Sequence, residues 1–512
     1  MTGLISIPHF RRPGLWLVLL AGLLSGAGKA QTPDFSAVHA PWFEVRTAHF
    51  QVYSCGTPQL VYKLTGRLEQ FCKAYALMAG SAAVASPPIV VLAFPDHERL
   101  KPFLPLYQGQ PANLAGFFKR GEDENLIVLA LPSDEDGGGD MTVIFHEYTH
   151  LLFRRNDRIW PLWLKEGMAE AYSTFATRGR AVSLAGPIAH HLRLLEQTPL
   201  MPLADLFVVG HDSPQYNESS RQGLFYAESW LLTQFLLAGD RPALRARFGG
   251  YTDRLRAGEN AVEAFTNALG VSLPAVEAQL RRYLADGQFP PLELMLSTNL
   301  STPIEITTRA LTPVEIYFRL GDELLRIERL DTAGEFFERA RNIGPAGPLP
   351  YEGLGLLAME RKQPAVALEN LTTALQRGST SFLAYYIYAR ERYRLTAKGG
   401  ENYHPLKDEA AAEIRDNLEK SLTLMPDYAP AQELTGFFEM VQGDQPVEAE
   451  LHLRRAIQLE PEDPSYLYSL AQFQFQNGQP AAAQATLEPL LKPNIEAAIR
   501  TQAEELIREN SR

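Results

Sequence analysis

The second half of the chain, from about residue 314, repeats its pattern of apolar and small residues. Tyr351 follows Tyr317 by 34 residues, and the other members of the pattern recur at the same offsets. The first unit consists of Tyr317, Leu320, Gly321, Leu324, Ala333, Phe337, Ala340 and Pro345, and the second of Tyr351, Leu354, Gly355, Ala367, Leu371 and Ala374. Each unit therefore predicts two amphipathic helices, with small residues where the helices cross and large apolar residues in the seams.

Further units extend the array to the end of the chain. A third begins near Phe382, is interrupted by the polar insertion TAKGGENYHPLKDEA and resumes at Ile414. The fourth runs from about Pro430, the fifth from Pro464, and the tail IEAAIRTQAEELIREN predicts a capping helix. This period and pattern resemble the tetratricopeptide repeat, which implies an all-α solenoid over residues 314–512. Its concave groove would suit a peptide or a protein partner, and a purely structural role stays open.

The first half predicts a mixture of strands and helices. The segments ANLAGFF and NLIVLAL predict two strands joined by the polar turn KRGEDE. The outer strand of this hairpin could pair with an extended substrate backbone. The segment from Pro161 to Phe175 predicts an amphipathic helix that can pack through Trp163, Leu164, Met168 and Tyr172.

A five-residue run, HEYTH, lies between these predicted elements. It places His146 and His150 one helical turn apart, with Glu147 next to His146. Imidazoles at i and i+4 project from one helix face and can bind a single Zn²⁺ ion. Glu147 would then lie beside the metal, where it can take a proton from a metal-held water. The motif predicts a zinc-dependent hydrolase.

A catalytic zinc site usually has three protein ligands, so the histidine pair requires one more. The short polar turn RRNDRIWP separates the motif from the next predicted helix, and its length suits two helices that double back on each other. Glu166 is thereby expected to be the third ligand. Glu170 lies one turn further on the same face and is expected to accept a hydrogen bond from the outer nitrogen of a ligand histidine.

The strings HEYTH and WLKEGMAEAY resemble the gluzincin metallopeptidases, which include the aminopeptidase N and thermolysin families. The nearest likeness is to bacterial peptidase MA-like proteins, whose second helix carries a similar W-L-x-E-G-x-A-E string, and it covers roughly residues 40 to 290. The resemblance implies a zincin-like α+β fold, peptidase activity and Glu166 as the third ligand. The small residues Gly167 and Ala169 fit it too, since they allow helices to approach closely. The gap from His150 to Glu166 is slightly shorter than in aminopeptidases.

The same resemblance suggests a second catalytic group. The helical segment QGLFYAESWLL contains a string similar to the Y-A-x-S-W of peptidase MA-like proteins, with Tyr226 near its start. In gluzincins of the aminopeptidase type, a tyrosine hydroxyl on a helix after the zinc motif stabilises the oxyanion. Tyr226 is the candidate for that role, and a tyrosine packed in the core is the alternative.

Other polar residues of this half have weaker claims. The turn sequence GEDEN loosely resembles the aminopeptidase string that binds a free amine, which would give Glu124 that role, but an acidic hairpin tip explains the same letters. His190, His191 and His211 follow the metal helices and could contact substrate. Exposed or capping roles are more common for unpaired histidines, so they are left out of the predicted site.

The chain ends and the composition limit the functional classes. Arg11 and Arg12, the apolar run GLWLVLLAGLL and the small-residue stretch SGAGKA predict an export signal over residues 1–30, with an uncleaved membrane anchor as the alternative. Loss of its three basic residues would lower the net charge from −12 to −15. Such a charge argues against nucleic acids and anionic membranes as partners. Cys55 and Cys72 could form a disulfide in an oxidising compartment or remain buried thiols.

The sequence thus predicts a signal peptide (1–30), a gluzincin-like metallopeptidase domain (31–295), a linker (296–313) and a tetratricopeptide-repeat domain with a capping helix (314–512). The expected protein is an exported, periplasmic or secreted zinc peptidase, in which the repeats dock substrates or partner proteins. The alternative is an inactive or weakly active protease fold that serves as a protein-binding scaffold in the cell envelope. An architecture related to the prediction is the periplasmic protease with C-terminal tetratricopeptide repeats, an analogy that suggests envelope quality control.

Overall fold

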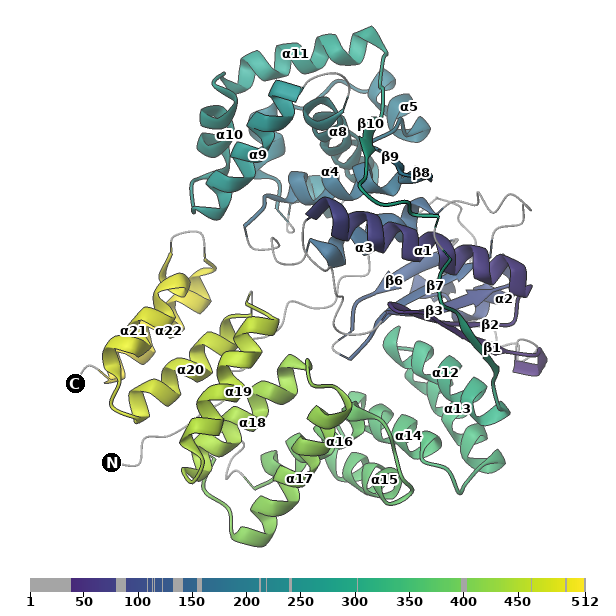
Figure 1. The fold of residues 1–512 in the computed structure, drawn as a ribbon, viewed down its shortest axis with the longest axis vertical. Helices are drawn as coiled ribbons and strands as arrows, with labels where there is room; N and C mark the ends of the chain where they lie inside the picture. The colour runs from purple at the N-terminus through teal and green to yellow at the C-terminus, as the bar shows by residue number, and fades with distance from the viewer. Residues whose placement is uncertain are drawn as a thin grey trace.

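The structure of the chain is a computed structural model that describes residues 38–79, 89–131, 141–153, 159–238, 242–396 and 403–510, apart from positions 108, 113, 115, 122, 211, 212, 218, 302, 462, 493 and 494. The predicted export segment 1–30 lies outside these residues. Among the described residues, no helix combines the length and the apolar character that a bilayer span requires. Figure 1 shows an α/β half above a curved array of helix pairs.

The N-terminal half is built on a mixed sheet of six strands in the order β11-β1-β2-β3-β7-β6. Strands β2, β3 and β7 are parallel, and the three others pair antiparallel with their neighbours. The strands are β1 (Phe43–Arg46), β2 (Phe50–Ser54), β3 (Ile89–Phe94), β6 (Gly116–Lys119), β7 (Asn125–Ala130) and β11 (Thr307–Ala310). The predicted hairpin is confirmed, because β6 pairs with β7 and leaves β6 as an edge strand.

The central strand β3 explains why both faces of the sheet are covered. All six residues of IVVLAF are buried, which is typical of a parallel strand enclosed on two sides. Ile89, Val91 and Ala93 face a core formed with α1 (Pro58–Ala79) and α3 (Thr142–Leu152). Phe71 of α1 stacks on Phe145 of α3 at 4.6 Å between ring centroids, which fixes α3 against this layer.

The opposite face of the sheet packs on the first helix pair of the repeat array. Val90, Leu92 and Phe94 of β3 share a core with residues of α12 (Pro313–Arg326) and α13 (Leu330–Ile343). The segment 296–313, expected to be a linker, contributes β11 to the sheet through its pairing with β1. The first repeat therefore covers one face of the sheet. Strand β11, which directly precedes α12, belongs to the sheet, so the predicted linker contains an ordered strand.

A second group of helices lies beyond α3 and α4 (Leu162–Ser173), at the top of Figure 1. Its long helix α8 (Ser219–Leu237) packs against α4. The contact belongs to the largest apolar cluster of the described residues, which includes Trp163 and Trp230. The other elements of the N-terminal half are α2 (His97–Leu100), η2 (Lys101–Phe103), β4 (Leu106–Tyr107), β5 (Gln110–Pro111), β8 (Ala176–Arg178), β9 (Ala181–Leu184), α5 (Ala189–Gln197), α6 (Leu203–Val208), α7 (Pro214–Asn217), α8 (Ser219–Leu237), α9 (Pro242–Arg256), α10 (Ala261–Leu269), α11 (Leu273–Asp286) and β10 (Leu292–Met295).

In the described part of the repeat array, five successive helix pairs are followed by a last helix, as the sequence predicts. Glycines lie where paired helices touch: a Cβ on Gly321 would come within 2.8 Å of Phe337, and one on Gly355 within 2.8 Å of Leu371. The remaining elements are α14 (Leu349–Glu360), α15 (Pro364–Gln376), α16 (Phe382–Arg394), α17 (Asp408–Leu424), α18 (Ala429–Gln442), α19 (Pro446–Leu459), α20 (Pro464–Gln476), α21 (Pro480–Leu487), η4 (Glu488–Leu491) and α22 (Ala497–Asn510).

A cluster of partly buried charges joins the β6–β7 turn to α12. Arg326 donates to both carboxylate oxygens of Asp123 at 2.9 and 2.6 Å and lies 3.0 Å from Asp322. Arg319 lies 3.4 Å from Glu124 and covers the ring of Tyr53 at 4.7 Å. Burial raises the pKa of Glu124 to about 7, although Arg326 and Arg319 act in the opposite direction. Glu124 thus faces the first repeat.

We expect Arg326→Ala to lower the free energy of unfolding by about 3–5 kcal/mol, because it leaves buried carboxylates without their cation. Urea unfolding followed by circular dichroism measures the change. Arg361→Ala is the matched control, since Arg361 pairs with a fully exposed Asp331 and should cost less than about 1 kcal/mol. Equal effects of the two substitutions would show that the cluster does not hold the two halves together.

Candidate metal centre

Two buried helices carry the predicted metal ligands. The HEYTH run lies within α3, and Glu166 and Glu170 lie within α4, which follows Pro161 as expected. The two helices pack against each other, so the predicted reversal of the chain is present. His146 and Glu166 are almost fully buried, at 2% and 3% exposure, whereas His150 is partly accessible. The site therefore has a buried interior and is partly accessible on the side of His150.

Three donor atoms converge between the helices. The Nε2 atoms of His146 and His150 are 3.1 Å apart. Oε2 of Glu166 lies 3.5 Å from Nε2 of His146 and 3.3 Å from Nε2 of His150. Among the described residues, this is the one group of three or more His, Cys, Asp or Glu side chains that could together hold a metal ion.

The triangle fits a zinc ion. Tetrahedral zinc binds nitrogen and oxygen at about 2.0–2.2 Å, which separates neighbouring ligand atoms by about 3.3–3.5 Å. The three observed separations lie at or near that range. Oε2 of Glu166 is also buried and accepts no hydrogen bond within the described part of the chain. A buried carboxylate oxygen without a donor is costly unless a cation or a proton meets it.

The electrostatics of the cluster favour positive charge at its centre. Burial lowers the pKa of His146, but the carboxylates of Glu170 and Glu166 outweigh this effect and raise the pKa well above its usual value. Burial raises the pKa of Glu166, yet the imidazoles of His150 and His146 hold it at about 2. The carboxylates are thus ionised and able to serve as ligands.

The two other predicted glutamates lie beside the triangle. Oε1 of Glu170 is 3.4 Å from Nδ1 of His146, which is the expected contact with the outer nitrogen of a ligand histidine. Glu147 is 7% exposed. Burial raises the pKa of Glu147 against the opposing effect of the His146 and His150 imidazoles, and the carboxylates of Glu166 and Glu170 add to the increase. A raised carboxyl pKa suits a group that must both accept and release a proton near neutral pH.

The structure brings two tyrosines to the site, of which the sequence indicated one. Tyr226 of α8 lies with its ring 6.1 Å from the ring of His146, and its hydroxyl is buried. Tyr216 of α7 stacks on Tyr226 at 6.3 Å between centroids and donates to Oε1 of Glu166 at 3.5 Å. Tyr216 was missed because α7 is a four-residue helix whose sequence carries no periodic signal. The ring of Tyr226 thus lies next to His146, whereas the hydroxyl of Tyr216 is already bonded to Glu166.

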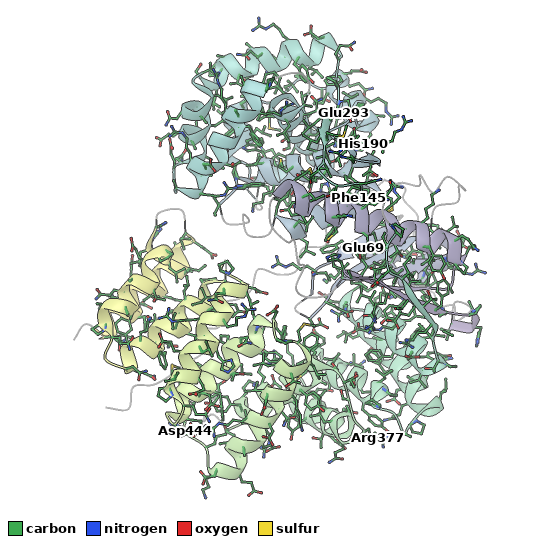
Figure 2. All side chains as sticks on the ribbon, in the orientation of Figure 1. Glu69, Phe145, His190, Glu293, Arg377 and Asp444 are labelled. Atoms are coloured by element: carbon green, nitrogen blue, oxygen red, sulfur yellow. The ribbon has the colours of Figure 1, made fainter. Side chains whose placement is uncertain are left out.

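The structure treats differently the three histidines that the sequence analysis left out of the site. His190 is exposed on α5, whereas His191 is buried and its Nε2 lies 3.3 Å from Oε2 of Glu170. His211 lies outside the described residues. Figure 2 shows Phe145 and His190 in the upper half of the molecule, far from Asp444 of the repeat array. Phe145 directly precedes His146, and His190 directly precedes His191. The sequence did carry a signal for His191, because it shares the buried face of α5 with Leu195.

Cys55 and Cys72 are not joined by a disulfide, and of the two thiols Cys72 is buried whereas Cys55 is partly exposed. Cys72 receives a hydrogen bond from Tyr148 of α3 at 3.4 Å. Burial raises the pKa of Cys55 to about 11, which makes its thiol a poor nucleophile.

A glycine beside Glu166 sets the distance between α4 and α8. A Cβ on Gly167 would lie 2.1 Å from Oγ1 of Thr233 and 2.4 Å from the carbonyl oxygen of Ser229. The small residue that was predicted to permit close helix packing does so here, and it fixes the backbone next to Glu166. Any larger side chain must push the two helices apart.

Gly167→Ala is therefore expected to lower the free energy of unfolding by about 1–3 kcal/mol. We also expect it to weaken zinc binding, because α4 carries Glu166. Thermal unfolding and zinc titration measure the two effects. Gly249→Ala in α9 is the control: a Cβ at that position would meet nothing within 4 Å, so the substitution should stabilise the helix by about 0.5–1 kcal/mol. Unchanged stability of the Gly167 variant would argue against a tight α4–α8 contact.

The comparison with known proteins bears on the helical half. A tetratricopeptide-repeat family model matches residues 440–499, a segment that runs from α18 to α22. The C-terminal half contains tetratricopeptide repeats. This match agrees with the predicted tetratricopeptide repeats, and so do the glycines at the contacts within the helix pairs. No curated protein matches the chain with significance.

Several solved structures are similar to a part of the chain. YrrB, a tetratricopeptide-repeat protein with an unusual peptide-binding site, is 14% identical, with 37% of this chain and 91% of YrrB covered at a TM-score of 0.31. A thermophilic tetratricopeptide-repeat protein of Thermus thermophilus is 22% identical, with 38% of this chain and 99% of that protein covered at 0.29. PilF of Pseudomonas aeruginosa is 16% identical, with 38% and 88% covered at 0.30.

Proposed function

We propose that the chain is an exported zinc-dependent peptidase whose repeats dock substrate or partner proteins. The observation that carries the proposal is the triangle of His146, His150 and Glu166 atoms, 3.1–3.5 Å apart in a largely buried site. These three residues would hold Zn²⁺. When bound, the ion supplies Lewis-acid activation of water and of a carbonyl group.

The residues around the triangle would divide the proton chemistry. Glu147 accepts the proton of the attacking water and passes it to the leaving amine, the two transfers that hydrolysis of an amide requires. Glu170 accepts a hydrogen bond from Nδ1 of His146 and so keeps Nε2 of that ring turned to the triangle. The hydroxyl of Tyr226 would stabilise the oxyanion. Tyr216, whose ring stacks on that of Tyr226, would supply a second hydroxyl close by.

The edge strand β6 would align the substrate. It is the terminal strand of the described sheet on the side of α3, and strand addition gives an extended peptide regular hydrogen bonds without selecting its side chains. Selection by sequence would then depend on other surfaces. The later repeats are suited to that task, because the inner layer of the first repeat is occupied by the sheet.

A second candidate is a protein-binding scaffold in which the N-terminal half has little or no activity. The tetratricopeptide match favours it directly, since such repeats commonly act as docking surfaces. A scaffold tolerates a bound metal, so metal content alone does not separate the two candidates. Turnover does.

The test is cleavage of a mixed peptide library by the chain lacking residues 1–30. We expect products that disappear after treatment with a zinc chelator and return after addition of Zn²⁺ in slight excess. Mass spectrometry of the products would distinguish internal cleavage from removal of N-terminal residues. A zinc-loaded, folded chain that yields no product from any peptide would leave the scaffold as the function.

A further inference from the structure

We propose that His191 is a positioning residue of the metal centre, which acts on His146 through Glu170. This inference rests on the proposed zinc site. His191 neither belongs to the triangle nor lies on its helices. It comes from α5, a helix that follows the two metal helices in the chain and packs against α8.

The geometry is a relay of three buried side chains. Glu170 directs Oε1 to Nδ1 of His146 at 3.4 Å and Oε2 to Nε2 of His191 at 3.3 Å. His146, Glu170 and His191 are 2%, 6% and 3% exposed, so solvent offers few competing hydrogen bonds. Each carboxylate oxygen of Glu170 thus faces its own imidazole nitrogen, and neither nitrogen of His191 has another hydrogen-bond partner among the described residues.

This arrangement fixes the position and the orientation of Glu170. A carboxylate with a donor on one oxygen alone can rotate about its last bond and exchange its oxygens. A second donor on the other oxygen removes that freedom. Glu170 then holds the Nδ1 hydrogen of His146, which leaves the Nε2 lone pair of His146 for the metal.

The ring of His191 is itself held in place. It lies 6.0 Å from the ring of Trp230, which is fully buried on α8. Leu195, one turn further along α5, is also buried and anchors the same helix face. The relay therefore connects the metal helices to a rigid part of the α8 cluster, and not to a loop.

The experiment compares zinc affinity in chains that keep or lose the donor. His191→Leu fills a similar volume without a donor, and His191→Gln retains an amide N–H that can reach Glu170. We expect the leucine variant to bind Zn²⁺ about 10- to 100-fold more weakly than the unaltered chain, and the glutamine variant to stay within a few-fold. Competition with a chromophoric chelator measures the affinity, and circular dichroism of the metal-free chains checks the fold. Glu196→Gln, at an exposed position of the same helix, is the control.

Wild-type affinity in a folded leucine variant would overturn the inference, and so would equal losses in the leucine and glutamine variants, which indicate a packing role. If the leucine variant does not fold, His191→Met replaces it, and a folded glutamine variant with weakened binding counts against the relay. A chain that binds zinc but cleaves no peptide refutes the peptidase proposal and leaves this inference standing. A chain with no affinity for zinc refutes both.

Discussion

Replacement of Glu147 by glutamine is expected to reduce peptide cleavage by about 10²- to 10⁴-fold while zinc binding remains intact. The amide is nearly isosteric with the carboxylate, so α3 keeps its packing, but it cannot accept the proton of the attacking water. Glu147 lies beside the donor triangle, and burial raises its pKa towards the range of a useful general base. Cleavage rates and metal content of the same preparation are the required measurements.

The matched control for that variant is Glu196→Gln, at an exposed position of α5 outside the cluster. Its rate and its zinc content should equal those of the unaltered chain. If Glu147→Gln cleaved peptides at the normal rate, proton transfer would have to be assigned to another group, and the proposed mechanism would be wrong.

Glu166→Ala is expected to weaken zinc binding by more than about 100-fold and to abolish cleavage with it, because it removes one of three ligands from the site. The variant also leaves the imidazoles of His146 and His150 without the carboxylate that they face, so circular dichroism of the metal-free chain must check the fold. Isothermal titration with Zn²⁺ measures the affinity. Glu293→Ala, at an exposed position of β10, should bind as the unaltered chain does. Full affinity after loss of Glu166 would remove this residue from the ligand set.

Local periodicity explains what the sequence could predict. His146 and His150 lie at i and i+4 on a helix, so their convergence needs no knowledge of the rest of the fold. The repeats are equally local, since each unit packs on its neighbour in sequence. The position of Glu166 was harder to predict, because this residue lies on the next helix. The short turn before Pro161 nevertheless left few ways to arrange the two helices.

The features that were missed depend on contacts between distant segments. The docking of α12 on β3 joins residues about 220 positions apart, and the alternation of Val90, Leu92 and Phe94 says only that a second layer exists. Tyr216 and His191 likewise reach the site through the packing of α5 and α7 on α8. A buried polar side chain gains its partner from tertiary structure, which no single-segment pattern encodes.

Diffraction from crystals of the metal-loaded chain, collected on both sides of the zinc absorption edge, would decide whether the three side chains bind one ion. We expect one strong anomalous peak per chain, within about 2.0–2.2 Å of Nε2 of His146, Nε2 of His150 and a carboxylate oxygen of Glu166. A zinc peak elsewhere, or a loaded site in which Glu166 turns away from both imidazoles, would show that the proposed metal centre is wrong.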